Sequence, residues 1–147
     1  MANVGSRLGA VVTLRRQVEE ERRRLCAAAA ERLDAARAAA RALERRRGQA
    51  LDELAQCQNR IHPAELRLWH QAIQYQAERL ERAAATANAL EVEYEAERAL
   101  LAQAVRERQA VERLEAKRRL AYAERQRRLE QARWDEIAGR RVRSGDG

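Results

Sequence analysis

Apolar residues recur at seven-residue intervals along the first part of this chain. One row of them runs through Val4, Val11, Val18 and Leu25. A second row runs through Ala36, Leu43, Ala50 and Cys57, and its companion runs through Ala40, Leu54 and Ile61, with Arg47 as the one charged member. Because a helix makes two turns in about seven residues, such rows predict one long helix that buries a narrow stripe against another helix. The spacing from Leu25 through Ala29 and Leu33 to Ala36 predicts a stutter where the two registers meet.

The second part of the chain shows the same periodicity over a greater length. Its first row is Leu66, Ile73, Leu80, Ala87, Tyr94 and Leu101. The companion row is Trp69, Ala83, Leu90, Ala104 and Val111, interrupted by the polar residues Gln76 and Glu97. We therefore predict a second long helix, also with one narrow apolar stripe.

The two periodic segments are separated by a short break that ends at Pro63. Proline is unfavourable inside a helix but suits its first position, and Glu65 places an acid in the first turn that follows. We predict helix one at about 5–58, a turn at about 59–62, helix two at about 64–139 and a frayed tail at 140–147. Helices joined by a tight turn pack antiparallel, so the predicted fold is all-α: a single coiled-coil hairpin domain over residues 1–147. Pairing with a second copy is the alternative, and the sharp break favours a monomer.

The second predicted helix is longer than the first and overhangs it at the C-terminus. Folding about residue 61 places Leu8 near residue 114, so residues 118–140 have no partner from helix one. Residues 113–143 contain 11 basic and 5 acidic residues, together with Tyr122, Leu129 and Trp134. We expect this segment to bury its apolar side chains against another protein. The alternative is a solvated helix end that frays.

The composition supports a coiled coil and argues against nucleic-acid-binding, membrane-spanning and disulfide-bonded proteins. The chain has no Phe, 3% aromatic residues, one Pro and 36% charged residues, and its net charge is +7. The basic triplets 22–24 and 45–47 each follow glutamate directly, so the signs are mixed and we expect no nucleic-acid partner. The longest apolar run covers only residues 25–30, which predicts no transmembrane segment, no export signal and a cytoplasmic protein. Cys26 and Cys57 lie too far apart along one helix to form a disulfide, and are interpreted as seam residues in a reducing compartment.

The side chains that carry catalysis are nearly absent. The two serines, Ser6 and Ser144, lie near the chain ends, and the two histidines, His62 and His70, have no nearby sulfur or acidic partner. No glycine-rich phosphate loop and no metal-ligand spacing occur. We therefore expect no enzyme, no metal and no cofactor.

The last third of the chain carries a more specific pattern. It contains Glu107-Arg108, Ala110, Glu112, Leu114, Lys117-Arg118, Tyr122, Glu124, Arg128, Glu130-Gln131, Asp135-Glu136 and Ala138. This pattern resembles the C-terminal motif of the FliJ family. The chain also resembles that family in length, in the break near residue 60 and in the Leu66, Trp69, Ile73 and Leu80 opening of helix two.

The resemblance implies a non-enzymatic stalk component of the flagellar type III export apparatus. It implies three partners: the hexameric export ATPase, the cytoplasmic domain of the export gate, and export chaperones. It also implies peripheral association with the export apparatus at the inner membrane.

Two sets of binding residues follow from this resemblance. The overhang becomes the ATPase-binding segment, with Arg118, Arg119, Tyr122, Arg125, Arg128, Leu129, Gln131, Trp134, Asp135 and Glu136 as its candidate contacts. The candidate gate contacts are Trp69, Ala72, Ile73 and Gln76. Ala72 departs from the family's preference for bulky residues in this region, so the gate contact is expected to differ here.

Two other interpretations remain open from the sequence. One is the equivalent stalk protein of a virulence-type injectisome, in the YscO-like group. The other is a coiled-coil scaffold of unspecified function.

Overall fold

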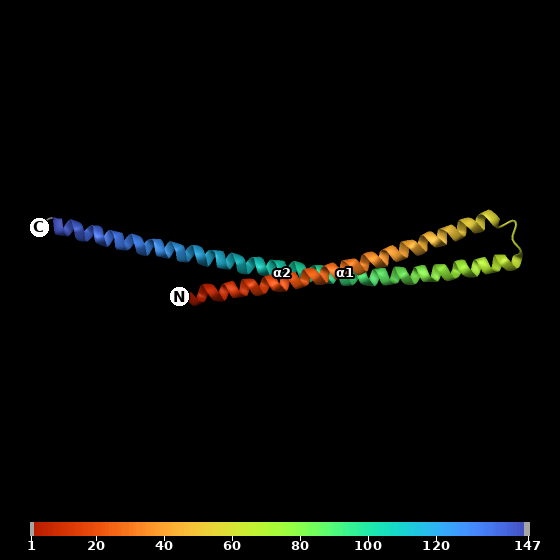
Figure 1. Cartoon of the computed structure of the whole chain (residues 1–147), viewed down its shortest axis with the longest axis horizontal. Helices are drawn as coiled ribbons and strands as arrows, with labels where there is room; N and C mark the ends of the chain where they lie inside the picture. The colour runs from red at the N-terminus through yellow and green to blue at the C-terminus, as the bar shows by residue number, and fades with distance from the viewer. Residues whose placement is uncertain (1, 146–147) are drawn as a thin grey trace. The chain divides into compact units, whose positions relative to one another are not determined.

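The structure is a computed structural model that describes residues 2–145, with side chains described from Arg7 onward. It contains two long helices, α1 (Ala2–Cys57) and α2 (Pro63–Gly145), and no strand within the described residues (Figure 1). The predicted all-α fold with two long, packed helices is confirmed.

Both helices extend further than the sequence predicted. α1 begins at Ala2 instead of about residue 5, and α2 continues through Gly139 to Gly145. Residues 140–145 are helical, so α2 ends later than predicted, while the fraying of this end stays a prediction and residues 146 and 147 lie outside the described part. A glycine inside a helix costs only about 1 kcal/mol relative to alanine. Here Arg140 also forms an ion pair with Glu136 across Gly139, at 2.6 Å.

The turn between the helices is held by backbone hydrogen bonds at both of its ends. The Arg60 N–H donates to the Cys57 carbonyl at 2.9 Å, and the Leu66 N–H donates to the His62 carbonyl at 3.0 Å. His62 Nδ1 also accepts a hydrogen bond from the Ala64 N–H, at 3.2 Å. The imidazole thereby satisfies one of the free donors at the start of α2, and Pro63 itself has no N–H to satisfy.

The chain forms two compact units. The first, called the turn unit, covers residues 20–102, and in it α1 and α2 lie side by side (Figure 1). The second, called the terminal unit, comprises residues 2–19 and 103–145 of the described chain. The single-domain organisation stays a prediction.

The turn unit has a narrow core of small residues. Its most buried apolar residues are Ala29, Leu33 and Leu54. The seam, meaning the less exposed residues that alternate every three and four positions and face the other helix, follows the predicted rows. On α1 it contains Arg22, Cys26, Ala29, Leu33, Ala36, Ala40, Leu43, Arg47, Ala50, Leu54 and Cys57. On α2 it contains Leu66, Trp69, Ile73, Gln76, Leu80, Ala83, Ala87, Leu90, Tyr94, Glu97 and Leu101. Both cysteines lie in the seam as free thiols.

The terminal unit has a seam that is largely charged. Its α1 members are Leu8, Val12, Arg15 and Glu19, and its α2 members are Ala104, Arg108, Val111 and Glu115. Among them, only Val12, Ala104 and Glu19 are buried, and the others are half-buried.

The prediction that the row from Val4 to Leu25 forms the seam is wrong. Val11, Val18 and Leu25 remain 38–39% exposed, and the side chain of Val4 lies outside the described residues. The residues that face α2 come one position later, which turns the buried face of α1 by about 100°. The alternation of three and four continues along α1 without interruption, so there is no stutter.

The C-terminal end of α2 continues past the N-terminal end of α1 (Figure 1). Glu115 is the last residue of the α2 seam. In the overhang, residues 118–145, every residue is exposed except Gln126 and Gly139, which are half-buried. The predicted C-terminal overhang is confirmed.

Candidate functional site

A network of ion pairs joins α1 and α2 in the terminal unit, just before the overhang begins. Glu19, which is 5% exposed, accepts a short hydrogen bond from Arg108 Nε. Arg108 also donates through Nη1 to Glu112 at 2.7 Å, and Glu112 in turn accepts from Arg16 Nε and Nη2 at 3.1 and 3.0 Å. A separate ion pair joins Arg15 to Glu107 at 2.7 Å. Because these pairs span both helices, they fasten the start of α1 to the segment of α2 that carries the overhang.

The charges in this cluster shift one another's titration. The hydrogen bond from Arg16, reinforced by Arg108, lowers the pKa of the Glu112 carboxyl from its ordinary value of 4.5. The hydrogen bond to Glu19 raises the pKa of the Arg108 guanidinium. Both groups are therefore held in their charged forms, which suits a structural clasp and not a proton donor or acceptor.

The overhang is strongly basic. Its residues include nine arginines and four acids, which gives a net charge of +5. Three of the arginines are paired with glutamates one turn earlier in the same helix: Arg119 with Glu115, Arg128 with Glu124, and Arg140 with Glu136. Arg118 and Arg125 form no ion pair within the described residues.

Large apolar side chains are distributed around the same helix. The most exposed are Leu120, Tyr122, Leu129, Trp134 and Val142, at 51–70%. All ten candidate ATPase contacts lie at exposed positions of the overhang, and they occupy several sides of the helix instead of one face. Two of them are tied within α2, because Gln131 donates to Asp135 at 3.1 Å. An exposed helix with apolar residues on all sides is typical of a segment that another protein surrounds.

The candidate gate contacts do not form one exposed surface. Trp69, Ile73 and Gln76 are half-buried in the seam, and only Ala72 is exposed. The exposed apolar residues of this stretch are Leu68 and Tyr75, at 65% and 58%.

Leu68, Ala72 and Tyr75 share one face of α2, because they are spaced by four and three residues. The Arg79 guanidinium extends this face, with its carbon 5.9 Å from the centre of the Tyr75 ring. The signal for Leu68 and Tyr75 was present in the sequence, since they are bulky residues that lie off the seam rows.

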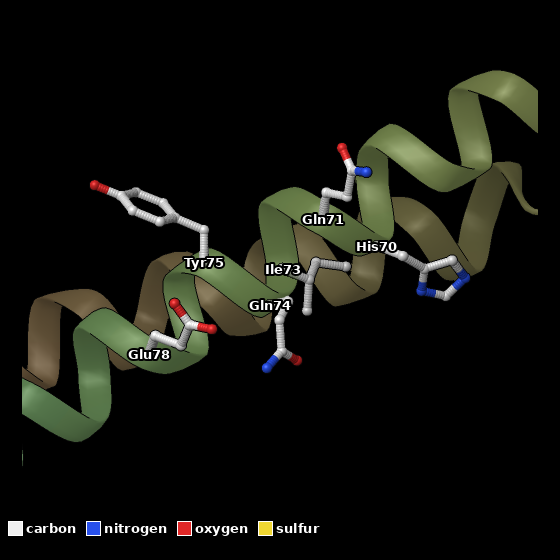
Figure 2. A pocket seen from close by; sticks show the side chains of 6 residues that line it. All are labelled: His70, Gln71, Ile73, Gln74, Tyr75 and Glu78. Atoms are coloured by element: carbon white, nitrogen blue, oxygen red, sulfur yellow. The ribbon is translucent and has the colours of Figure 1, made fainter.

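An open hollow of about 520 Å³ lies on α2 beside this face. It is lined by His70, Gln71, Ile73, Gln74, Tyr75 and Glu78. Figure 2 shows that His70, Tyr75 and Glu78 point in different directions, so no titratable groups converge on one point. Across the described residues there is also no group of three or more His, Cys, Asp or Glu side chains that could hold a metal ion. The hollow has the character of a surface depression and not of a catalytic pocket.

Comparison with known families assigns the chain. The family described as "Flagellar FliJ protein" matches residues 4–146. The chain belongs to the FliJ family. Neither the search of curated proteins nor the search of solved structures found a match.

Membership of the FliJ family gives the chain a role in flagellar protein export, within a family of non-catalytic components of the export apparatus. Over residues 2–145, neither helix contains a stretch long and apolar enough to span a membrane.

Proposed function

We propose that this FliJ-family chain is a stalk of the flagellar export apparatus whose overhang binds the hexameric export ATPase. The observation that supports this most directly is the overhang itself. It is a basic helix that exposes large apolar residues, such as Leu129 and Trp134, and receives no cover from the described part of its own chain.

The distribution of these residues suits the bore of a ring. A single helix with its side chains is about 10–12 Å wide, and a surrounding ring contacts it from several sides at once. Leu129 and Trp134 lie on different sides of α2, as such an environment requires. Exposed charge pairs are individually weak, at about 0–1 kcal/mol each. Contacts of this kind orient a stalk without holding it in one position while the ring subunits change conformation.

A second surface is proposed for the cytoplasmic domain of the export gate. It consists of Leu68, Ala72 and Tyr75, with Arg79 at its edge, and replaces the seam residues Trp69, Ile73 and Gln76. Export chaperones are the third proposed class of partner, on the basis of family membership alone. Binding to these components would place the protein peripherally at the inner membrane.

The ATPase proposal is tested by a pull-down with the purified export ATPase. The full chain is compared with a chain that lacks residues 118–147, and circular dichroism checks that the shortened chain remains helical. We expect the ATPase to be recovered with the full chain only. Equal recovery with both proteins would reject the overhang as the ATPase site.

The gate surface is tested separately with the Leu68→Asp/Tyr75→Asp double variant. We expect this variant to lose binding to the cytoplasmic gate domain while it retains the ATPase. Loss of the gate domain by a Gln74→Asp control as well would contradict the assigned face, because Gln74 is exposed and is not three or four residues from Leu68, Ala72 or Tyr75.

The family match favours the flagellar system over a YscO-like injectisome stalk or an unspecified scaffold. A motility assay in a deletion strain distinguishes them, since only a flagellar component is required for swimming.

A further inference from the structure

The spacing of the α2 seam continues beyond Glu115, the last seam residue, into positions of the overhang that are called seam positions here although α1 does not cover them. In the overhang the same alternation of three and four continues through Arg118, Tyr122, Arg125, Leu129 and Ala132, all of which are exposed. The overhang thus carries one half of a coiled-coil interface, continuous with the half that α1 covers in the same unit. These positions span about two heptads, and the next positions of the same alternation are Glu136, Gly139 and Arg143.

Paired parts of the chain show how this seam accommodates charge. In the terminal unit, the seam residue Arg108 is matched by Glu19 of the facing helix. In the turn unit, the seam residue Glu97 is approached to 3.8 Å by Arg22 of the facing helix. Both examples fit the physical requirement that a half-buried charge needs an opposite charge from the other side.

The flanks of the seam are matched in the same way. Arg16 pairs with Glu112 in the terminal unit, and Arg37 pairs with Glu91 at 3.3 Å in the turn unit. In both cases α1 contributes the arginine and α2 the glutamate. The overhang reverses this pattern, because there α2 itself supplies an excess of arginine.

The two arginines at the seam positions of the overhang, Arg118 and Arg125, have no ion pair within the described residues, and the same holds for Arg127, Arg133, Arg141 and Arg143 outside those positions. Arg119, Arg128 and Arg140 lie beside the seam and are each paired within α2. Arg125 has Tyr122 and Leu129 as its seam neighbours and no acidic residue three or four positions away. Arg118 and Arg125 therefore need carboxylates from outside the described chain if the seam is to be covered.

We propose that the overhang binds an acidic amphipathic helix, which lies along this seam and completes the coiled coil. The helix presents apolar residues to Tyr122 and Leu129, and glutamate or aspartate to Arg118 and Arg125. The proposal deepens the proposed function, on which it rests, by specifying the element of the partner protein that the overhang recognises.

The first experiment uses the full chain and two synthetic 28-residue helical peptides as probes. One peptide has leucine facing the apolar seam positions and glutamate facing the arginines, and the other has lysine in place of glutamate. Fluorescence anisotropy should show binding of the glutamate peptide, weakened by salt, and no binding of the lysine peptide. Failure of the glutamate peptide to bind overturns the proposal.

Matched variants then distinguish binding of the peptide at the seam positions from a general electrostatic attraction of the peptide to a basic helix. Arg118→Glu/Arg125→Glu should weaken binding of the glutamate peptide about tenfold, because two ion pairs are replaced by repulsion. Arg127→Glu/Arg141→Glu changes the net charge equally on the opposite side of α2 and should weaken it less than about threefold. Equal weakening by the two double variants overturns the proposal.

A second pair of variants tests the apolar contact. Leu129→Asp in the seam should weaken binding about tenfold or more, whereas Leu120→Asp, which is off the seam and 70% exposed, should change it little. A duplex oligonucleotide provides the competing case. If the duplex displaces the peptide, and the Leu129→Asp substitution leaves the affinity for the duplex unchanged, the surface is a nucleic-acid site and the proposal is overturned.

The same variants are tested against the export ATPase. If the ATPase binds the full chain and the seam variants equally but not the chain lacking 118–147, the proposed function holds and the helix inference fails. If the full chain fails to bind the ATPase while the glutamate peptide and the variants behave as described, the helix inference holds and the ATPase assignment fails.

Discussion

At the scale of single residues, Glu19 is the buried charged residue among the described side chains. A buried carboxylate is stable only when its charge is compensated, and Arg108 provides that compensation across the seam. The pair therefore fixes which residues of α1 and α2 face one another more than it adds to stability, as a charged position does in other coiled coils.

The substitution Glu19→Gln tests this role. We expect it to lower Tm by several degrees, because it leaves Arg108 in the seam with one carboxylate fewer. Glu20→Gln is the matched control, since that side chain is 58% exposed and should leave Tm nearly unchanged. Thermal unfolding followed by circular dichroism measures both, and equal Tm values for the two variants would contradict the assigned role.

The neighbouring Glu112 predicts a dependence of stability on pH. Its pKa is lowered in the folded chain by Arg16 and Arg108, so the folded state favours the ionised carboxyl. The resulting stabilisation is present above 4.5, the ordinary pKa, and is lost as the pH falls through the lowered folded value. We expect Tm to fall below pH 4.5, and to fall less steeply in the Glu112→Gln variant. Identical slopes in wild type and variant would show that this carboxyl does not contribute.

At the scale of the helices, periodicity predicted the seam correctly wherever the seam is apolar. The rows that begin at Ala36 and at Leu66 are the residues that face the other helix. The error lies in the first part of α1. There the seven-residue row is apolar at both Val11 and Val18, whereas the row that is buried contains a valine, Val12, and a charged residue, Glu19. Apolar periodicity could not locate the seam there, because ion pairs across the helices replace apolar contacts.

Arg47, the charged residue within the apolar α1 seam of the turn unit, lowers the free energy of unfolding. Arg47 Nε and Gln76 Oε1 are buried without a hydrogen-bond partner. Replacing Arg47 with leucine should raise the free energy of unfolding by about 1 kcal/mol, because it removes an unsatisfied donor and adds an apolar seam residue. Arg46→Leu is the control, since Arg46 is exposed and should give no gain. Chemical denaturation measures both variants, and a loss of stability in Arg47→Leu would contradict the argument.

At the scale of the whole molecule, three regions differ in how far packing against the other helix stabilises their helical structure. The seam of the turn unit is mostly apolar, the seam of the terminal unit is largely charged, and the overhang has no covering helix within the described chain. Isolated helices are marginal in water, because most helical stability in proteins comes from packing.

Hydrogen exchange should therefore differ along α2. We expect amides of residues 118–145 to exchange much faster than those of residues 80–100 in the turn unit. Addition of the export ATPase should slow exchange in the overhang selectively. Equal protection of both segments in the free chain would mean that the overhang is already covered, for example by self-association.

The overhang was predicted from the sequence, whereas the exposed face of Leu68, Ala72 and Tyr75 was not, although its two bulky residues lie off the predicted seam rows. The position of Pro63 and the lengths of the two periodic segments determine which helix is longer. The face of α2 that remains free depends on which residues enter the seam, and Trp69 is a bulky residue that enters it. A motif shared with a family therefore located the region but not the side chains that it exposes.

If the overhang enters the bore of a ring as proposed, the change from two helices to one limits how far it inserts. Beyond the start of α1 the terminal unit narrows to a single α2 rod, about 10–12 Å wide and roughly 40 Å long. An opening too narrow for two packed helices can admit this rod only until the N-terminal end of α1 reaches its rim. The start of α1 would then stop insertion at the rim, and lengthening the overhang by whole turns would carry its tip about 5.4 Å further past the rim for each turn.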